Sequence, residues 1–214
     1  MNLFPGIQPA SASGQLARNL EAFETPPEAV DDLVYGRPDL VPEGAAIWEP
    51  CAGTQTLAQT LRRHGHEVVS TDIHDWGQGP YYDIRDVLEF RSPLAGTVVT
   101  NPPFKRAHEI IEHLLEIGVG RVIALHAWNW WLSSPTSQNA NTAAVGQFFV
   151  RRPPSQILPL LRRVSLWRFD IPIHERGGTS PMRYAWYVFD AAHAGAPTCP
   201  WLPRWDRPTE GAAT

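Results

Sequence analysis

Segments with strand character alternate with segments of helical character through the first two thirds of the chain, and this alternation narrows the possible folds most. Short apolar runs occupy residues 45–50, 66–73, 96–104 and 121–128. Amphipathic helical patterns occupy residues 26–36, 54–65 and 107–120. Strands that are separated by helices pair in parallel, and the helices cover both faces of the sheet. The sequence therefore predicts an α/β fold with a Rossmann-like, doubly wound, mostly parallel sheet.

The last strands depart from this alternation. Residues 164–173 and 183–190 have strand character, and they are joined only by residues 174–182, which include Gly177 and Gly178. No helix fits between them, and a short glycine-containing link favours antiparallel pairing. We therefore expect an antiparallel C-terminal hairpin that closes the parallel sheet.

The length of 214 residues, with 43% hydrophobic and 19% charged residues, fits one compact domain. We expect a flexible N-terminal arm over residues 1–20, the domain over residues 21–192 and a C-terminal extension over residues 193–214. The N-terminus lacks the features of a secretory signal, and the chain has no apolar run of about 18 residues. These features predict a cytoplasmic protein that has no membrane partner.

Cysteine content and charge limit the kinds of site. Cys51 and Cys199 provide neither a disulfide framework nor the paired spacing of a zinc site, so we predict no metal. Residues 1–150 contain 9 basic and 17 acidic side chains, whereas residues 151–214 contain 9 and 5. The candidates for phosphate contacts in the basic part are Arg151, Arg152, Arg162, Arg163 and Arg168. They either meet nucleic-acid phosphates or form a solvated helix face.

Polar residues follow three of the predicted strands. In open α/β sheets, ligands bind beyond the carboxyl ends of the strands, near the point where strand order reverses. Cys51, Ala52 and Gly53 follow the first strand and let the backbone approach a ligand closely, while Glu49 favours a cationic or hydroxyl-bearing ligand. Asp72 ends the second strand and is suited to ribose hydroxyls. Taken alone, such a small-residue turn is often only a tight turn, and an aspartate after a strand is often only a helix cap.

The sequence Asn101-Pro102-Pro103-Phe104 follows the next strand. Two successive prolines remove two N–H donors and hold the chain extended, which leaves acceptors at the strand end. The side-chain oxygen of Asn101 and the carbonyl of Pro102 are able to accept hydrogen bonds from an amino group. Phe104 offers an aromatic face to a planar base. The alternative is a proline-rich loop exit with Phe104 in the core.

Together these motifs resemble those of the class I S-adenosylmethionine-dependent amino-methyltransferases, and most closely the small phage and prophage N6-adenine DNA methyltransferases. Residues 101–104 match the catalytic [Asp/Asn/Ser]-Pro-Pro-aromatic motif of that family. Residues 48–53 look like its first motif, residues 71–73 like its acidic second motif, and residues 23–30 like its upstream Thr-Pro motif. The motifs occur in the family's order and span about residues 20–190.

The resemblance implies S-adenosylmethionine as the cofactor and a role for each matched residue. The residues that would hold the methionine part are Thr25, Pro26, Glu49, Cys51 and Gly53. Asp72 would bind the ribose hydroxyls, and Ile73 would lie against the adenine. Asp83 would bind the adenine amino group, although Asp86 lies nearby in the sequence. Many relatives have a second glycine shortly after Gly53, and here Thr54 or Thr56 is expected to cap the helix instead.

The resemblance also implies a mechanism. Hydrogen bonds from the target amine to Asn101 and Pro102 would concentrate the nitrogen lone pair towards the methyl group. A base in duplex DNA must be flipped out first, and Phe104 is the expected stacking platform. Trp128, Trp130 and Trp131 either wall this pocket or pack in the core.

The motif leaves the acceptor open. DNA adenine is the favoured acceptor, because the small chain and the Thr-Pro motif look most like the phage enzymes. Related motifs occur in enzymes that methylate guanine N2 in RNA or glutamine N5 in protein. A binding module without activity, which retains the cofactor or nucleic-acid site, is the alternative of another class. Neither the recognition sequence nor the oligomeric state follows from these motifs.

Overall fold

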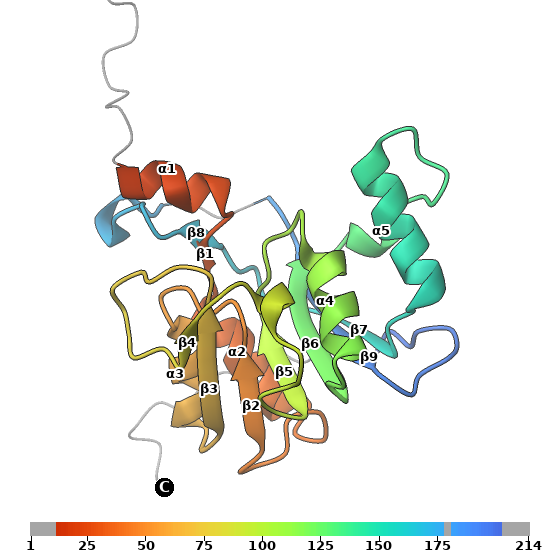
Figure 1. The fold of residues 1–214 in the computed structure, drawn as a ribbon, viewed down its shortest axis with the longest axis horizontal. Helices are drawn as coiled ribbons and strands as arrows, with labels where there is room; N and C mark the ends of the chain where they lie inside the picture. The colour runs from red at the N-terminus through yellow and green to blue at the C-terminus, as the bar shows by residue number, and fades with distance from the viewer. Residues whose placement is uncertain (1–11, 178–180, 203–214) are drawn as a thin grey trace, which may run out of the picture.

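The computed structural model describes residues 12–177 and 181–202, which build a seven-stranded sheet covered by helices on both faces (Figure 1). The strand order is β4-β3-β2-β5-β6-β9-β7. The strands of this sheet are β2 (Ala46–Glu49), β3 (Glu67–Asp72), β4 (Asp83–Ile84), β5 (Thr97–Thr100), β6 (Arg121–Ala127), β7 (Gln156–Pro159) and β9 (Tyr184–Asp190). The first five in chain order pair in parallel, as the alternating sequence pattern predicts.

The order of the strands reverses beside β2. The chain proceeds from β2 to β3 on one side and then returns to place β5 on the other side. The helices are α1 (Ala12–Asn19), α2 (Pro27–Gly36), α3 (Thr56–Arg63), α4 (Ala107–Glu116) and α5 (Ala140–Arg151), with short 3₁₀ turns at Val87–Glu89, Trp130–Leu132 and Ile173–Glu175. Helices α2 and α3 pack on one face of the sheet, and α4 and α5 pack on the other.

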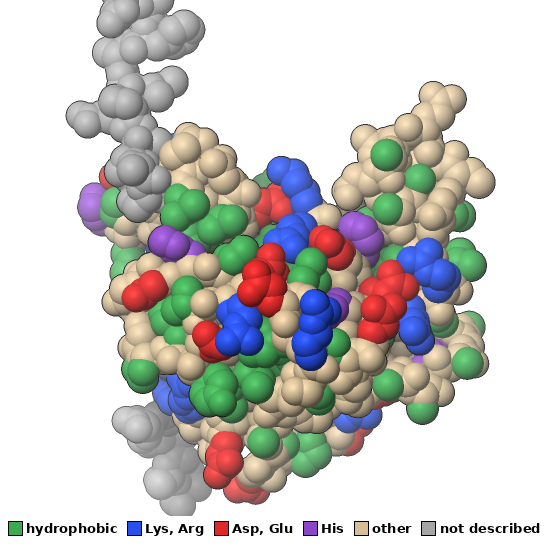
Figure 2. Space-filling model, viewed as in Figure 1, with side chains coloured by type: hydrophobic (Ala, Val, Ile, Leu, Met, Phe, Trp, Pro, Cys, Tyr) green, Lys and Arg blue, Asp and Glu red, His purple; other side chains and the backbone are tan. Residues whose placement is uncertain are grey.

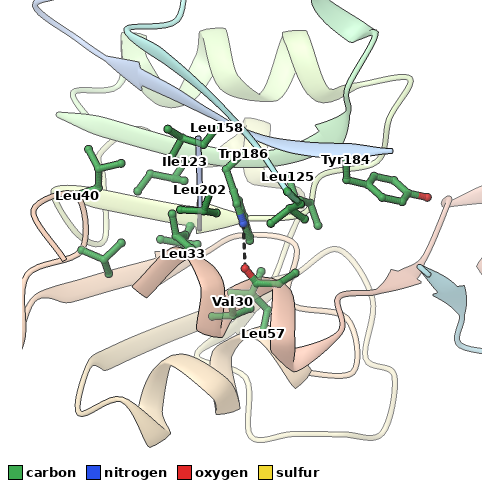
Figure 3. Close-up of a cluster of buried hydrophobic side chains, with 14 of the residues drawn as sticks. Val30, Leu33, Leu40, Leu57, Ile123, Leu125, Leu158, Tyr184, Trp186 and Leu202 are labelled. Carbon is green, nitrogen blue, oxygen red and sulfur yellow. Dashed lines mark hydrogen bonds between the residues drawn. The ribbon is translucent and has the colours of Figure 1, made fainter. Parts of the chain in front are cut away.

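The strand sequences explain the two covered faces. Successive residues of a strand point to opposite faces, so a strand that is buried on both sides is apolar throughout. Ile47 of β2 lies in the core beneath α2 and α3, and its neighbour Trp48 lies in the core beneath α4. Figure 3 shows the core beneath α2 and α3. There the indole Nε1 of Trp186 in β9 donates to the carbonyl of Ala29 in α2 at 3.0 Å. This bond fixes helix and sheet together inside an apolar layer.

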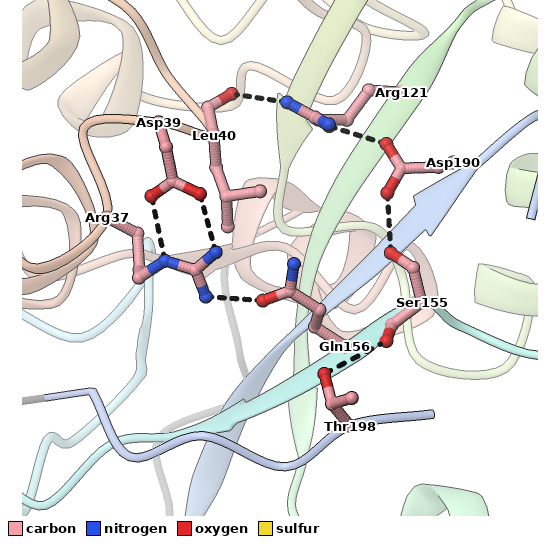
Figure 4. Close-up of polar contacts among 8 residues, drawn as sticks. All are labelled: Arg37, Asp39, Leu40, Arg121, Ser155, Gln156, Asp190 and Thr198. Atoms are coloured by element: carbon pink, nitrogen blue, oxygen red, sulfur yellow. Dashed lines mark hydrogen bonds and ion pairs between the residues drawn. The ribbon is translucent and has the colours of Figure 1, made fainter. Parts of the chain in front are cut away.

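Polar contacts join the sheet, at the amino ends of its parallel strands, to the turn after α2 (Figure 4). Arg121 at the start of β6 pairs with Asp190 at the end of β9, with 2.6 Å between Nε and Oδ1, and also donates to the carbonyl of Leu40. Ser155 donates to the other oxygen of Asp190 at 2.6 Å. Because these contacts lie at the amino ends of the parallel strands, they leave the carboxyl ends open.

The antiparallel addition to the sheet is confirmed, but its strand partners differ from the predicted hairpin. β9 pairs antiparallel with both β6 and β7. Since both edges of β9 are occupied, residues 164–173 have no edge of β9 on which to pair. Their strand β8 (Trp167–Arg168) pairs instead with β1 (Phe23–Glu24) in a separate two-stranded sheet.

The structure describes part of each predicted terminal segment. Within the expected flexible arm over residues 1–20, Ala12–Asn19 form α1, while residues 1–11 lie outside the described part. Of the predicted C-terminal extension, residues 193–202 are described. Thr198 exchanges backbone hydrogen bonds with Ser155 and Ile157 beside β7, and Leu202 is buried. No helix in the described part of the chain is long and apolar enough to span a membrane.

The contact between Trp186 and Ala29 leads to a stability prediction. Trp186→Phe removes the hydrogen bond and leaves unfilled space in a close-packed core, so the free energy of unfolding should fall by about 2 kcal/mol. Urea denaturation followed by circular dichroism measures the change. Trp201, which is 77% exposed, provides the matched control, and Trp201→Phe should change the value by less than about 0.5 kcal/mol. Equal losses in the two variants would contradict this account of the core.

Candidate active site

The reversal of strand order brings the predicted motifs to one edge of the sheet. β2 ends at Glu49, β3 ends at Asp72, and β5 leads directly into Asn101. Parallel pairing aligns these carboxyl ends, as expected for a ligand crevice at a topological switch point. In the space-filling view, a notch opens between the part of the molecule that carries α1 and the part that carries α5 (Figure 2).

Two adjoining cavities lie at this edge. The large cavity encloses about 860 Å³ of empty space, including its open mouth, and its lining includes Pro50, Cys51, Gly53, Asp72, Ile73, Asn101 and Pro103. The small cavity is lined in part by Thr25, Glu49, Cys51, Thr54, Thr56 and Asn101. Eight of the predicted site residues therefore line one cavity or both. Pro26, Asp83, Pro102 and Phe104 line neither.

Asp72 is buried and organises the turn after β2. Its Oδ2 accepts from the backbone N–H of Gly53 at 2.8 Å. Its Oδ1 accepts from the backbone N–H of His74 and from the indole Nε1 of Trp76, each at 3.0 Å. Burial raises the pKa of Asp72, and the three N–H donors oppose this shift by stabilising the carboxylate. The residue joins the ends of β2 and β3 through hydrogen bonds.

Glu49 is more deeply buried than Asp72 and is only partly satisfied. Its side chain is 2% exposed, and Oε2 has no hydrogen-bond partner. Burial raises the pKa of Glu49 well above its ordinary value, and the nearby charge of Asp72 raises it further. Burial likewise raises the pKa of the Cys51 thiol, which favours the neutral thiol over the nucleophilic thiolate. The small cavity therefore favours a ligand group that donates hydrogen bonds or carries positive charge.

Asn101 presents an acceptor to the same site. Its Nδ2 donates to the backbone carbonyl of Phe23 in β1 at 3.3 Å. Its Oδ1 is buried and has no partner. With its amide nitrogen held by Phe23, the side chain directs only its oxygen to a ligand. The two prolines that follow carry no backbone N–H that would compete for this oxygen.

Phe104 is partly buried and packs against the core beneath α2. Its ring lies 4.3 Å from the ring of His126, measured between centroids, and His126 in turn stacks on Trp130 at 4.1 Å. Trp130 is buried, whereas Trp131 is 40% exposed. Of the three tryptophans considered in the sequence, Trp130 is therefore a core residue.

His126 was not identified from the sequence, although it contacts the Asn-Pro-Pro-Phe segment. The backbone N–H of Ala127 donates to Nδ1 at 2.8 Å, so the ring proton resides on Nε2. Nε2 can then donate to the carbonyl of Phe104, at 3.3 Å. Burial lowers the pKa of His126 to about 3, which keeps the ring neutral. The imidazole thus holds one end of the segment in place.

The two acids near β4 have different environments. Asp83 forms an ion pair with Arg85 at 2.7 Å and does not line the large cavity. Asp86 does line the cavity, accepts from the backbone N–H of Leu88 and pairs with Arg106 at 3.1 Å. Spacing alone did not distinguish the two acids, because the path of the chain after β4 decides which one faces the cavity.

The helix cap expected from Thr54 or Thr56 is absent. Helix α2 begins after Pro26 and helix α3 begins after Gln55, and neither has a side-chain cap. Thr56 instead donates to Glu24 Oε1 at 2.6 Å, and Thr54 does so at 3.4 Å. The turn is therefore fixed to β1, a contact that no local sequence signal indicates.

Three of the five candidate phosphate-binding arginines form ion pairs within the protein. Arg151 pairs with Glu112 at 2.8 Å, Arg162 with Asp32 at 3.1 Å and Arg168 with Asp170 at 2.9 Å. Of these three arginines only Arg151 belongs to a helix, so they do not form one helix face. No group of three or more potential metal ligands is found among the residues that the structure describes.

Comparison with known proteins identifies the fold. No protein-family model and no curated protein matches the chain. A Pyrococcus horikoshii protein assigned provisionally as an RNA methyltransferase is 19% identical, with a TM-score of 0.56 over 80% of this chain and 88% of that chain. The methyltransferase subunit of a type I restriction-modification system from Streptococcus thermophilus is 9% identical, with a TM-score of 0.53 over 80% of this chain and 45% of that chain. The chain therefore has the Rossmann-like fold of class I methyltransferases.

Burial of Glu49 leads to a prediction about pH and stability. A carboxyl group whose pKa is higher in the folded state than its ordinary 4.5 loses stabilising free energy as pH rises from 4.5 to the folded pKa. Glu49→Gln removes this loss, so the variant should be more stable than the wild type at pH 7, and the difference should shrink towards pH 4. Urea denaturation across this pH range measures it.

The control for this experiment is Glu89→Gln at the exposed end of the 3₁₀ turn Val87–Glu89, which should leave the pH dependence unchanged. A Glu49→Gln variant that is less stable than the wild type at pH 7 would show that the ionised carboxylate is stabilised by its surroundings, contrary to the account given above.

Proposed function

We propose that the chain is an S-adenosylmethionine-dependent N-methyltransferase whose preferred acceptor is the N6 amine of adenine in DNA. One observation carries the proposal: Glu49 Oε2 and Asn101 Oδ1 are buried, lack partners and belong to adjoining cavities at the switch point. Each such acceptor costs about 1–3 kcal/mol when left unsatisfied. A cofactor with a cationic amino-acid end, together with an acceptor amine, would satisfy both.

The residues present fit this cofactor. Glu49 and Thr25 line the small cavity and would hold the methionine ammonium and carboxylate groups. Asp72 would bind ribose hydroxyls, with Ile73 beside the adenine. Cys51 and Gly53 would form the wall between the two ends of the cofactor, and Pro26 would support this wall from its position directly before α2.

The acid for the adenine amino group is better assigned to Asp86 than to Asp83. Asp86 lines the large cavity, and Asp83 is turned to Arg85. When bound, S-adenosylmethionine supplies an electrophilic methyl group on its sulfonium. The residues of the chain then have only to orient the acceptor and favour its nucleophilic form.

Asn101 would perform the central task. Its free Oδ1 would accept a hydrogen bond from the target amine, and the carbonyl of Pro102 would accept the second amine proton. An aromatic amine is a weak nucleophile because its lone pair is delocalised into the ring. Two acceptors on the amine protons favour a more tetrahedral nitrogen and concentrate the lone pair, and the amide dipole stabilises the positive charge that develops on the nitrogen. Pro103 would shape the wall beside the amine.

Phe104 would have a less direct role than its motif position implies. Its ring is packed against His126 and lines neither cavity. Stacking on a flipped base would therefore use the outer part of the ring while His126 supports the inner face. A flipped base costs a few kcal/mol in lost stacking, which aromatic contacts must offset.

DNA is the preferred acceptor because the motifs look most like those of the phage adenine enzymes, and a restriction-modification methyltransferase subunit shares the fold. RNA guanine N2 is the second candidate, since the Pyrococcus horikoshii protein shares the fold over most of both chains. Glutamine N5 in protein presents a similar amide nitrogen. All three acceptors offer a planar amino group to Asn101.

Asn101 provides the direct test of the proposal. Asn101→Ala removes the acceptor oxygen, so methyl transfer should fall by at least about 100-fold. Affinity for S-adenosylhomocysteine, measured by calorimetry, should change by less than about threefold, because no cofactor group is assigned to this oxygen. Tritiated methyl transfer to DNA, RNA and cell protein measures the activity and identifies the acceptor class.

Asn101→Asp is the matched variant, because it keeps an acceptor oxygen and should retain more activity than Asn101→Ala. Cofactor binding by the wild type without transfer to any acceptor would favour the binding module. Equal loss of transfer and of cofactor affinity in Asn101→Ala would argue against the role assigned to this side chain.

A further inference from the structure

Phe169 lies between the large and the small cavity and lines both. Its ring packs directly on Gly53, so closely that a β-carbon added to Gly53 would collide with it. Gly53 has a φ of +52°, which also favours glycine at this turn. The ring therefore covers the backbone that separates a ligand in one cavity from a ligand in the other.

Trp76 completes this aromatic cover. Its ring meets Phe169 edge to face, with centroids 5.1 Å apart and planes at 89°. Its indole Nε1 donates to Asp72 Oδ1 at 3.0 Å and thus occupies one oxygen of a carboxylate that lines the large cavity. A ligand hydroxyl that binds this oxygen has to compete with the indole.

Phe169 belongs to a segment, residues 167–176, that is bound to β1 and to the residues next to it. β8 pairs with β1, and the backbone N–H of Phe169 donates to the carbonyl of Ala22 at 3.3 Å. Further along this segment, Arg176 pairs with Glu24 at 2.5 Å, and Glu24 also accepts from Thr56 at the start of α3. These contacts hold the backbone of residues 167–176, whereas the ring of Phe169 is partly exposed.

We propose that Phe169 is a cofactor-binding residue that covers the Gly53 turn in the free protein and moves aside when a single ligand spans both cavities. The inference rests on the proposed function, because S-adenosylmethionine joins a nucleoside to an amino acid and has to pass the turn that Phe169 covers. Trp76 moves with it and yields Asp72 to the ligand. The ring then packs against the bound cofactor and excludes water from it.

The first test compares ligands that differ only in the amino-acid end. S-adenosylhomocysteine requires both cavities, whereas methylthioadenosine requires only the large one. Phe169→Trp enlarges the cover and should weaken S-adenosylhomocysteine binding by about tenfold or more, while methylthioadenosine binding changes by less than about threefold. Calorimetry gives both dissociation constants. Ile173→Ala, an 81% exposed position on the same segment, is the control and should leave the ratio unchanged.

The second test needs no substitution at Phe169. In ¹⁵N-labelled wild-type protein, the indole N–H resonance of Trp76, assigned by its loss in Trp76→Phe, should shift when S-adenosylhomocysteine is added. The indole resonance of exposed Trp201 should stay in place.

The outcomes separate the two proposals. S-adenosylhomocysteine could bind without moving the Trp76 resonance, and Phe169→Trp could leave the ratio of the two dissociation constants unchanged. Those results together would overturn the role of Phe169, while the proposed function would stand. If the wild type binds neither ligand, the proposed cofactor is wrong and this inference is lost with it.

Discussion

The parallel pairing of β2 with β5 is the constraint on which the rest of the structure depends. Ile47 pairs with Thr97 and Trp48 with Val98, while the other edge of β2 pairs with β3. Because the chain leaves β2 in one direction and returns on the other side, α3 and α4 cover opposite faces and the strand ends between them stay open. This opening places Glu49, Asp72 and Asn101 around a shared site. Without this pairing, the three side chains would not meet at the two adjoining cavities.

The electrostatics of the site follow from that arrangement. Two carboxylates from adjacent parallel strands are buried near each other, and burial raises the pKa of both. Asp72 is compensated by three N–H donors, whereas one oxygen of Glu49 is not. Two buried oxygens without partners, Glu49 Oε2 and Asn101 Oδ1, thus lie at the carboxyl edge of the sheet, whereas at the amino edge Arg121 is paired with Asp190. Such a site is suited to bind a cation or a hydrogen-bond donor.

Aromatic side chains provide the second level of organisation. Phe104, His126 and Trp130 form a stack that joins the Asn-Pro-Pro-Phe segment to the interior. Phe169 and Trp76 form a separate pair over Gly53 and Asp72. The first group is tied to buried residues and is suited to hold the segment rigid. The second has its rings partly exposed and its polar atom on a carboxylate, so it is suited to exchange its contacts for those of a ligand.

The sequence by itself determined the parallel sheet, the helices α2, α3 and α4 and the strand-end positions of Glu49, Asp72 and Asn101. Those features depend on local periodicity and on glycine and proline, whose effects act within a few residues. Only the tertiary structure decided that β9 pairs with β7, that Asp86 rather than Asp83 lines the cavity, and that Thr54 and Thr56 bind Glu24. It alone also placed Phe169 on Gly53, because that contact joins residues more than a hundred positions apart, and no local preference specifies which distant segments meet.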